Sequence, residues 1–187
     1  MNREESKNVY VGPIATVPTP FDDDYEVDHG RMADATRWWV DNGLVKGRTV
    51  LKVRAALGEG PQLRDHELFS LFRTVVQASD GKANVVGCIH YKDTVRAIED
   101  AKKAQDLGVV GLQISPPIWN GPNVDDILLY CRVGMAGAGE LGVLEFRRMM
   151  DFEKLVAIKW GPPPGVAYEA IYELADHYAI IDNRRNP

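Results

Sequence analysis

Cysteine is scarce in this sequence, and so are long apolar runs and clusters of positive charge. Cys88 and Cys131 lie far apart with no CxxC spacing, so we expect neither a disulfide framework nor a thiolate zinc site. No stretch approaches the roughly 18 apolar residues of a membrane span, and the first residues lack the apolar core of a secretory signal. These features predict a cytoplasmic protein with no membrane partner.

The composition is that of an ordinary globular protein. The 187 residues are 45% hydrophobic and 26% charged, with a net charge of −5. No stripe of lysine and arginine stands out, so we expect no nucleic-acid partner. The length suggests one domain, residues 1–187, and this domain is partial if its fold usually needs a longer chain.

Apolar runs alternate with amphipathic stretches along the chain. The runs typical of strands are Ile14–Val17, Thr49–Val53, Asn84–His90, Val109–Ser115, Gly142–Leu144, Leu155–Lys159 and Tyr178–Asp182. The stretches typical of helices are Met32–Asn42, Asp65–Ser79, Thr94–Leu107, Val124–Arg132, Phe146–Phe152 and Val166–His177. This alternation predicts an α/β protein with a parallel sheet covered by helices.

Two folds fit such a pattern, and the spacing favours one of them. Strands recur about every 25 to 35 residues without a long excursion, which favours a (β/α)8 TIM barrel over a doubly wound sheet. A whole barrel takes about 250 residues. We therefore expect an incomplete barrel of about seven strands, with a shortened fifth-strand region and no C-terminal strand and helices.

Lys159 is the first candidate for chemistry. It lies at the end of the apolar run Leu155–Lys159, and strand ends face the active site of a barrel. Burial among apolar side chains disfavours the ammonium, which frees the amine to attack a carbonyl carbon. The alternative is a surface lysine just past a strand.

Other motifs are less specific. Gly58-Glu59-Gly60 is either an anion-binding turn or a plain connection, and Trp119 either walls a pocket or packs under a loop. The GxGxxG at Gly137–Gly142 lacks the acidic residue expected about 20 positions later, so a flexible loop is favoured over a dinucleotide site. No HxH or HExxH spacing exists, so we expect no metal and no cofactor, although His90 ends a strand.

Four motifs together resemble the dihydrodipicolinate synthase and N-acetylneuraminate lyase family of class I aldolases. They are Gly12–Met32 with its TPF turn, Ala55–Glu67 with GEGPQL, Asp106–Trp119 with its two prolines, and Leu155–Trp160 with IKW. The resemblance implies a TIM barrel, usually oligomeric, in which Lys159 forms an imine with pyruvate or another 2-oxo acid that reacts with an aldehyde. It also implies that Leu57, Gly58 and Trp119 bind substrate.

The chain also departs from that family pattern. The two hydroxyl residues that bind the keto-acid carboxylate fall on Ala56 and Leu57, which have no side-chain donor. The family's tyrosine after the fifth strand is missing near Leu144. Loss of a general acid or base typically costs 10²–10⁴-fold in rate. The hypotheses are therefore a lyase acting through Lys159, a catalytically inactive member or binding subunit, and, third, a dinucleotide-binding oxidoreductase.

Overall fold

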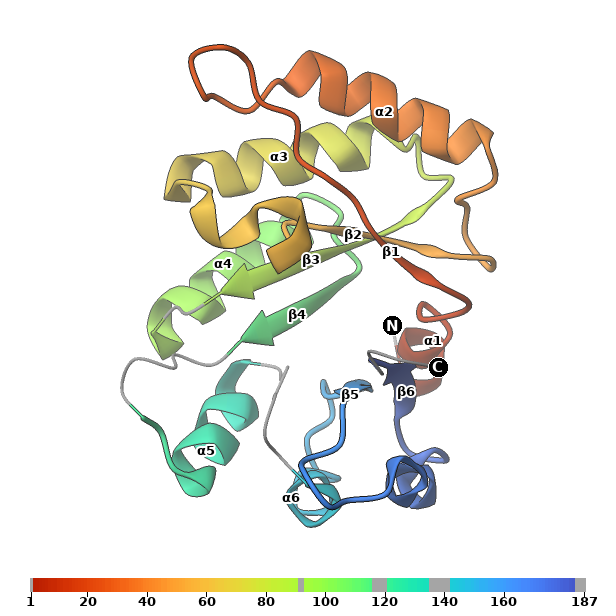
Figure 1. Cartoon of the computed structure of the whole chain (residues 1–187), viewed down its shortest axis with the longest axis vertical. Helices are drawn as coiled ribbons and strands as arrows, with labels where there is room; N and C mark the ends of the chain where they lie inside the picture. The colour runs from red at the N-terminus through yellow and green to blue at the C-terminus, as the bar shows by residue number, and fades with distance from the viewer. Residues whose placement is uncertain (1, 91–92, 116–120, 135–141, 184–187) are drawn as a thin grey trace.

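The computed structural model describes residues 2–90, 93–115, 121–134 and 142–183, and Figure 1 shows the whole chain. The strands are β1 (Ile14–Thr16), β2 (Val50–Val53), β3 (Asn84–His90), β4 (Gly111–Ser115), β5 (Ala157–Trp160) and β6 (Ala179–Asp182). The α-helices are α1 (Arg3–Lys7), α2 (His29–Asp41), α3 (Asp65–Ala78), α4 (Thr94–Asp106), α5 (Val124–Gly134) and α6 (Val143–Arg147). Short 3-10 helices are η1 (Ala56–Gly58), η2 (Gly60–Gln62) and η4 (Tyr168–Leu174).

The strands form two parallel sheets whose order follows the chain. One has the order β1-β2-β3-β4 and the other the order β5-β6. Strand order without reversal is the order of a barrel wall, whereas a doubly wound sheet reverses at a switch point. With helices α2, α3 and α4 covering the outer face of the larger sheet (Figure 1), the fold is an incomplete (β/α)8 barrel, as predicted.

One predicted strand is wrong. Residues predicted as the strand Gly142–Leu144 lie at the start of helix α6. The Gly142 amide donates a hydrogen bond to Glu145 Oε2 over 2.9 Å, which caps the first turn, and the helix buries Phe146. A three-residue run could not outweigh this cap and this burial, so the described residues contain six strands.

Two apolar clusters lie behind the two sheets. In the larger sheet, alternate residues such as Leu51, Val53 and Val85 pack with α2 and α3. In the smaller sheet, Ile158 and Trp160 pack with residues of α5, α6 and η4. The other face of each strand is therefore left to line the space between the sheets.

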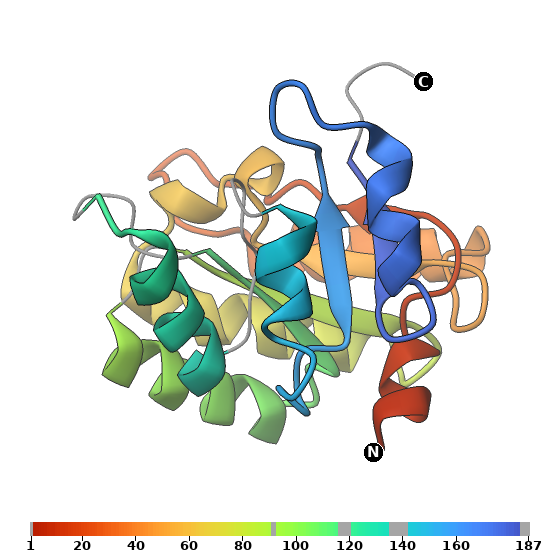
Figure 2. The ribbon, with the colours of Figure 1, turned by 90° about the horizontal axis from the view of Figure 1, so that it is seen from below.

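Helix α1 joins the two sheets, although the sequence pattern did not predict it. The Arg3 guanidinium donates to the carbonyl oxygens of Phe152 (2.9 Å), Leu155 (2.8 Å) and His177 (3.3 Å). The following residues, Val9 and Tyr10, pack with the larger sheet. Figure 2 shows α1 beside the C-terminal helical segment. We call the three hydrogen bonds from Arg3 to Phe152, Leu155 and His177 the clasp.

Among the described residues, no helix is long and apolar enough to cross a membrane.

Candidate functional site

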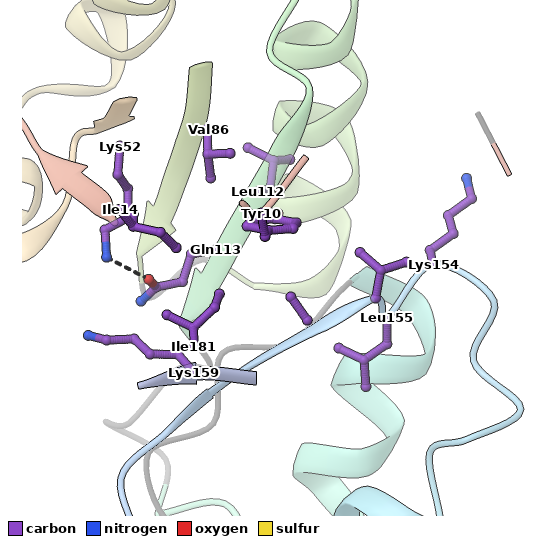
Figure 3. Close-up of a pocket in the computed structure, with 12 residues that line it drawn as sticks. Tyr10, Ile14, Lys52, Val86, Leu112, Gln113, Lys154, Leu155, Lys159 and Ile181 are labelled. Atoms are coloured by element: carbon purple, nitrogen blue, oxygen red, sulfur yellow. Dashed lines mark hydrogen bonds between the residues drawn. The ribbon is translucent and has the colours of Figure 1, made fainter. Parts of the chain in front are cut away.

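A cavity lies between the two sheets. Its wall is formed by Tyr10, Ile14, Lys52, Val86, Leu112, Gln113, Lys154, Leu155, Val156, Ala157, Lys159 and Ile181 (Figure 3). Most of these residues come from β1 to β4 on one side and from β5 and β6 on the other. The remaining ones are Tyr10, which follows α1, and residues 154–156, which lead into β5. The cavity is therefore the interior of the incomplete barrel.

Lys159 reaches this cavity because of the alternation of side chains along β5. Ile158 and Trp160 are buried in the cluster behind the sheet, and Ala157 and Lys159 face the cavity. Lys159 is the third of four strand residues, near the carboxyl end where barrels place their active sites. Desolvation and then the positive charge of Lys52 lower the pKa of Lys159 from its usual value, which raises the share of neutral amine.

Lys52 is a second lysine of the cavity that the sequence analysis did not single out. It is the third of four residues in β2 and is 8% exposed. Its ammonium donates a hydrogen bond to Gln113 Oε1 over 2.9 Å, which links β2 to β4 (Figure 3). The signal available in the sequence was a lysine inside an otherwise apolar strand.

Cys88 of β3 is fully buried and carries a free thiol. Burial raises the pKa of the Cys88 thiol to about 11, although Lys52, Arg54 and Lys159 act in the opposite direction. The thiol therefore stays protonated near neutral pH and gives no negative charge to the neighbouring cations.

A hydrogen-bonded group lies at the carboxyl ends of β2, β3 and β4. His90 Nε2 lies 2.8 Å from the Arg54 carbonyl oxygen, which can only accept, so this nitrogen carries the proton. The other ring nitrogen lies 3.3 Å from Ser115 Oγ. Burial lowers the pKa of His90, which keeps the ring neutral. The prediction that His90 ends a strand is confirmed.

The predicted substrate-binding residues do not all lie at the cavity. Leu57 of η1 is 88% exposed, and its side chain does not line the cavity wall. Gly58 is buried, and its amide donates to the Ala55 carbonyl oxygen. A side chain does not fit there, since a Cβ would lie 2.4 Å from the Val17 carbonyl oxygen. Trp119 and most of the GxGxxG segment lie outside the described residues, and Gly142 precedes α6.

Among the described residues, one group has a spacing compatible with a metal ion: Glu26, His66 and Glu67. Arg64 already pairs with both carboxylates, at 2.6 Å from Glu26 and 3.1 Å from Glu67. The Arg64 guanidinium therefore already neutralises the carboxylates that a metal ion would bind, so this cluster gives no support for a metal site.

Known proteins resemble this chain in sequence and in fold. The dihydrodipicolinate synthetase family matches residues 10–162. The 4-hydroxy-tetrahydrodipicolinate synthase of Heliobacterium modesticaldum is 32% identical over 78% of this chain and 52% of its own length. Synthase 1 of Halalkalibacterium halodurans is 33% identical over 80% of this chain and 54% of its own length. The chain thus spans about half the length of these curated relatives.

A solved structure agrees with the fold. Dihydrodipicolinate synthase from Bacillus anthracis superposes with a TM-score of 0.79 over 94% of this chain and 63% of its own, at 23% identity. At that identity the superposition shows the fold alone, and the family is shown by the sequence matches. This chain belongs to the dihydrodipicolinate synthetase family.

Proposed function

We propose that the protein is a lyase or aldolase that forms an imine between Lys159 and a 2-oxo acid such as pyruvate. The single observation that carries this proposal is the position of Lys159. It is an amine with a lowered pKa, near the carboxyl end of a strand, facing the interior of a barrel of the dihydrodipicolinate synthetase family.

The chemistry follows from a neutral amine beside a bound ketone. The Lys159 nitrogen attacks the ketone carbon, a C–N bond forms, and the resulting carbinolamine loses water to give the imine. The protonated imine nitrogen withdraws electrons, so the neighbouring carbon loses a proton and becomes an enamine. This carbon then forms a bond with the aldehyde carbon, whose oxygen takes up a proton. Hydrolysis releases the product and restores the amine; cleavage follows the same steps in reverse.

Leu57, Gly58 and Trp119 remain the substrate-binding positions that we propose from the family resemblance. For Leu57 and Gly58 the groups in question are backbone amides, since neither side chain donates a hydrogen bond. The Gly58 amide donates to the Ala55 carbonyl, so it would have to exchange this partner for a carboxylate.

We also propose that the active assembly is a homo-oligomer in a reducing cytoplasm, with no cofactor, no nucleic acid and no membrane partner. Two free, buried cysteines support the reducing compartment. Within the described residues, β4 and β5 each pair with one strand only, and this supports an added partner chain because strand edges without a partner favour association.

The test is borohydride trapping. Pyruvate is added to the full chain, the imine is reduced, and the modified lysine is located by peptide mapping. We expect the adduct at Lys159, its loss in Lys159→Met, and an unchanged yield in Lys154→Met, which removes an exposed lysine of the same cavity wall. A protein that melts cooperatively but gives no adduct at Lys159 contradicts the proposal.

A second candidate is a family member that binds 2-oxo acids without turnover. Two observations favour it: Leu57 stands in place of a hydroxyl residue and faces solvent, and the element after α5 is helix α6 where the resemblance places a strand and a tyrosine. This candidate predicts an adduct at Lys159 with no measurable aldol cleavage. Any measurable cleavage that Lys159→Met abolishes excludes it.

A further inference from the structure

The cavity contains cations without an anion. Among the described residues, its wall has three lysines, Lys52, Lys154 and Lys159, and no aspartate or glutamate. In Figure 3 the amine ends of Lys52 and Lys159 lie on the same side as Gln113, and Lys154 points away from them. The two interior lysines therefore share one part of the cavity.

Lys52 has only a neutral partner in the described part of the chain. Its hydrogen bond to the Gln113 side chain leaves two further N–H groups of a buried ammonium, and the neighbouring Cys88 thiol is protonated near neutral pH. Burying a charge is unfavourable unless it is paired. A site of this kind is suited to an anion that arrives with the ligand.

We propose that Lys52 binds the carboxylate of the 2-oxo acid whose carbonyl carbon reacts with Lys159. This inference rests on the proposed function of Lys159, and it assigns to Lys52 the role of the two hydroxyl groups that Ala56 and Leu57 do not supply.

The geometry fits the two groups of such an acid. In a 2-oxo acid the carboxylate carbon is bonded directly to the ketone carbon, so the two binding groups must lie on one side of one cavity. Lys52 and Lys159 are each the third of four residues in their strands, on opposite walls. Gln113, held by Lys52, offers an amide N–H₂ that can also donate to the carboxylate. A bound carboxylate also offsets the repulsion between the Lys52 ammonium and the protonated imine that forms at Lys159.

The experiment compares an acid with its ester. Imine trapping at Lys159 is titrated with pyruvate and with methyl pyruvate, whose carboxyl group carries no charge. In Lys52→Met we expect the half-saturating pyruvate concentration to rise about tenfold or more, because a charge-assisted hydrogen bond is lost. The value for methyl pyruvate is expected to change less than about threefold. Lys52→Arg keeps the charge and recovers part of the pyruvate affinity, and Lys154→Met is the matched control with no effect.

Two results would overturn the proposal. One is an equal loss for pyruvate and methyl pyruvate in Lys52→Met, which places the effect on the Lys159 amine instead of on the carboxylate. The other is unchanged pyruvate trapping in Lys52→Met. Cooperative thermal melting of each variant shows that the comparison concerns folded protein.

A second measurement separates this inference from the proposed function. Lys159→Met forms no imine, so its pyruvate binding, followed by broadening of the pyruvate NMR signal, reports the carboxylate site alone. Loss of this binding in Lys52→Met/Lys159→Met supports Lys52 even if the wild-type chain gives no adduct. Equal binding by the single and the double variant contradicts the role of Lys52 even if the adduct forms.

Discussion

The two halves of the barrel are built differently. The half formed by β1 to β4 has four paired strands, long helices α2, α3 and α4, and a core centred on fully buried residues such as Leu71 and Phe72. The half formed by β5 and β6 has two short strands, the five-residue helix α6 and the 3-10 helix η4. Lys159 belongs to the smaller half and Lys52 to the larger one.

This difference bears on how the positions of the two cavity lysines are fixed. Neighbouring strands of one sheet fix each other by backbone hydrogen bonds, but the relative position of Lys52 and Lys159 depends on how the two sheets pack. The halves are connected by the clasp of Arg3 with the following residues Val9 and Tyr10, and also by helix α5. Tyr130 of α5 packs with the larger half, and Leu128 of the same helix packs with the smaller one. The proposed chemistry therefore depends on these contacts between the halves.

The largest loss of stability is expected from a substitution in the core of the smaller half. Trp160 is 1% exposed, packs edge-on against Phe146 and donates its indole N–H to the Tyr168 carbonyl oxygen. Replacing it with alanine is expected to cost about 3–5 kcal/mol in the free energy of unfolding, because a large cavity is left. Urea unfolding followed by circular dichroism measures this loss.

The matched variant in the larger half is Phe72→Ala, which removes a side chain that is also fully buried. If the halves unfold together, both variants shift a single transition by similar amounts. Two separate transitions in Trp160→Ala, with the second at the wild-type position, would show that the halves unfold independently and would break the comparison.

The second effect concerns the clasp. Arg3→Ala removes three hydrogen bonds from a guanidinium to backbone carbonyl groups, so we expect a loss of about 1–3 kcal/mol. Lys7→Ala, which removes one exposed hydrogen bond to the Asp176 carbonyl oxygen, is expected to cost less than about 1 kcal/mol. Equal effects of the two variants would mean that the clasp does not hold the halves together.

The third effect is the pH dependence that Lys159 contributes. Its pKa is lowered by folding, so the unfolded chain binds the proton more tightly. Below the lowered pKa the destabilisation is fully present, and stability is regained as pH rises toward the usual value of 10.5. Lys159→Met is thus expected to be more stable than the wild type near pH 7, by less than about 1 kcal/mol given solvent screening.

Denaturant unfolding of both proteins from pH 7 upward measures this difference, which should shrink as pH rises. Lys154→Met, at an exposed position, serves as the control and should run parallel to the wild type at every pH. A difference that grows with pH has the wrong sign and refutes the assignment.

The smallest effect is expected at Leu57. Its side chain is 88% exposed, so Leu57→Thr should change stability by less than about 0.5 kcal/mol. Because this side chain does not line the cavity, the new hydroxyl should leave the half-saturating pyruvate concentration within about twofold. A tenfold gain would show that the turn after β2 moves toward the cavity when substrate binds. Ala56→Thr tests the neighbouring position in the same way.

The sequence predicted the larger half better than the smaller one, for a physical reason. Asn84–His90 is buried and rich in β-branched residues, and the predicted strand has the observed bounds. Asp65–Ala78 buries one regular stripe, so its periodicity was clear. In the smaller half the segments are short, so local contacts determine their secondary structure. Glu145 caps a helix where a strand was predicted, and Val166–His177 contains a 3-10 helix.

From the sequence, the position of a candidate residue could be predicted only where its place along a strand is sufficient, and its role stays a prediction. Lys159 is recognisable because it closes an apolar run, and its placement on the cavity wall fits that prediction. Lys52 was missed because a lysine within Val50–Val53 interrupts an apolar strand, and its significance depends on Gln113, 61 residues later in the chain. The α1 clasp was missed because its partners lie 149 to 174 residues away.

The long distance along the chain between Arg3 and its partners also affects the order in which the two halves fold. The strands β1 to β4 pair with neighbours that are close in the chain, so the larger half can form early. Arg3 must wait for Phe152, Leu155 and His177, and closing so large a loop is slow. During synthesis Lys159 would therefore be held opposite Lys52 only after the chain has been made as far as His177.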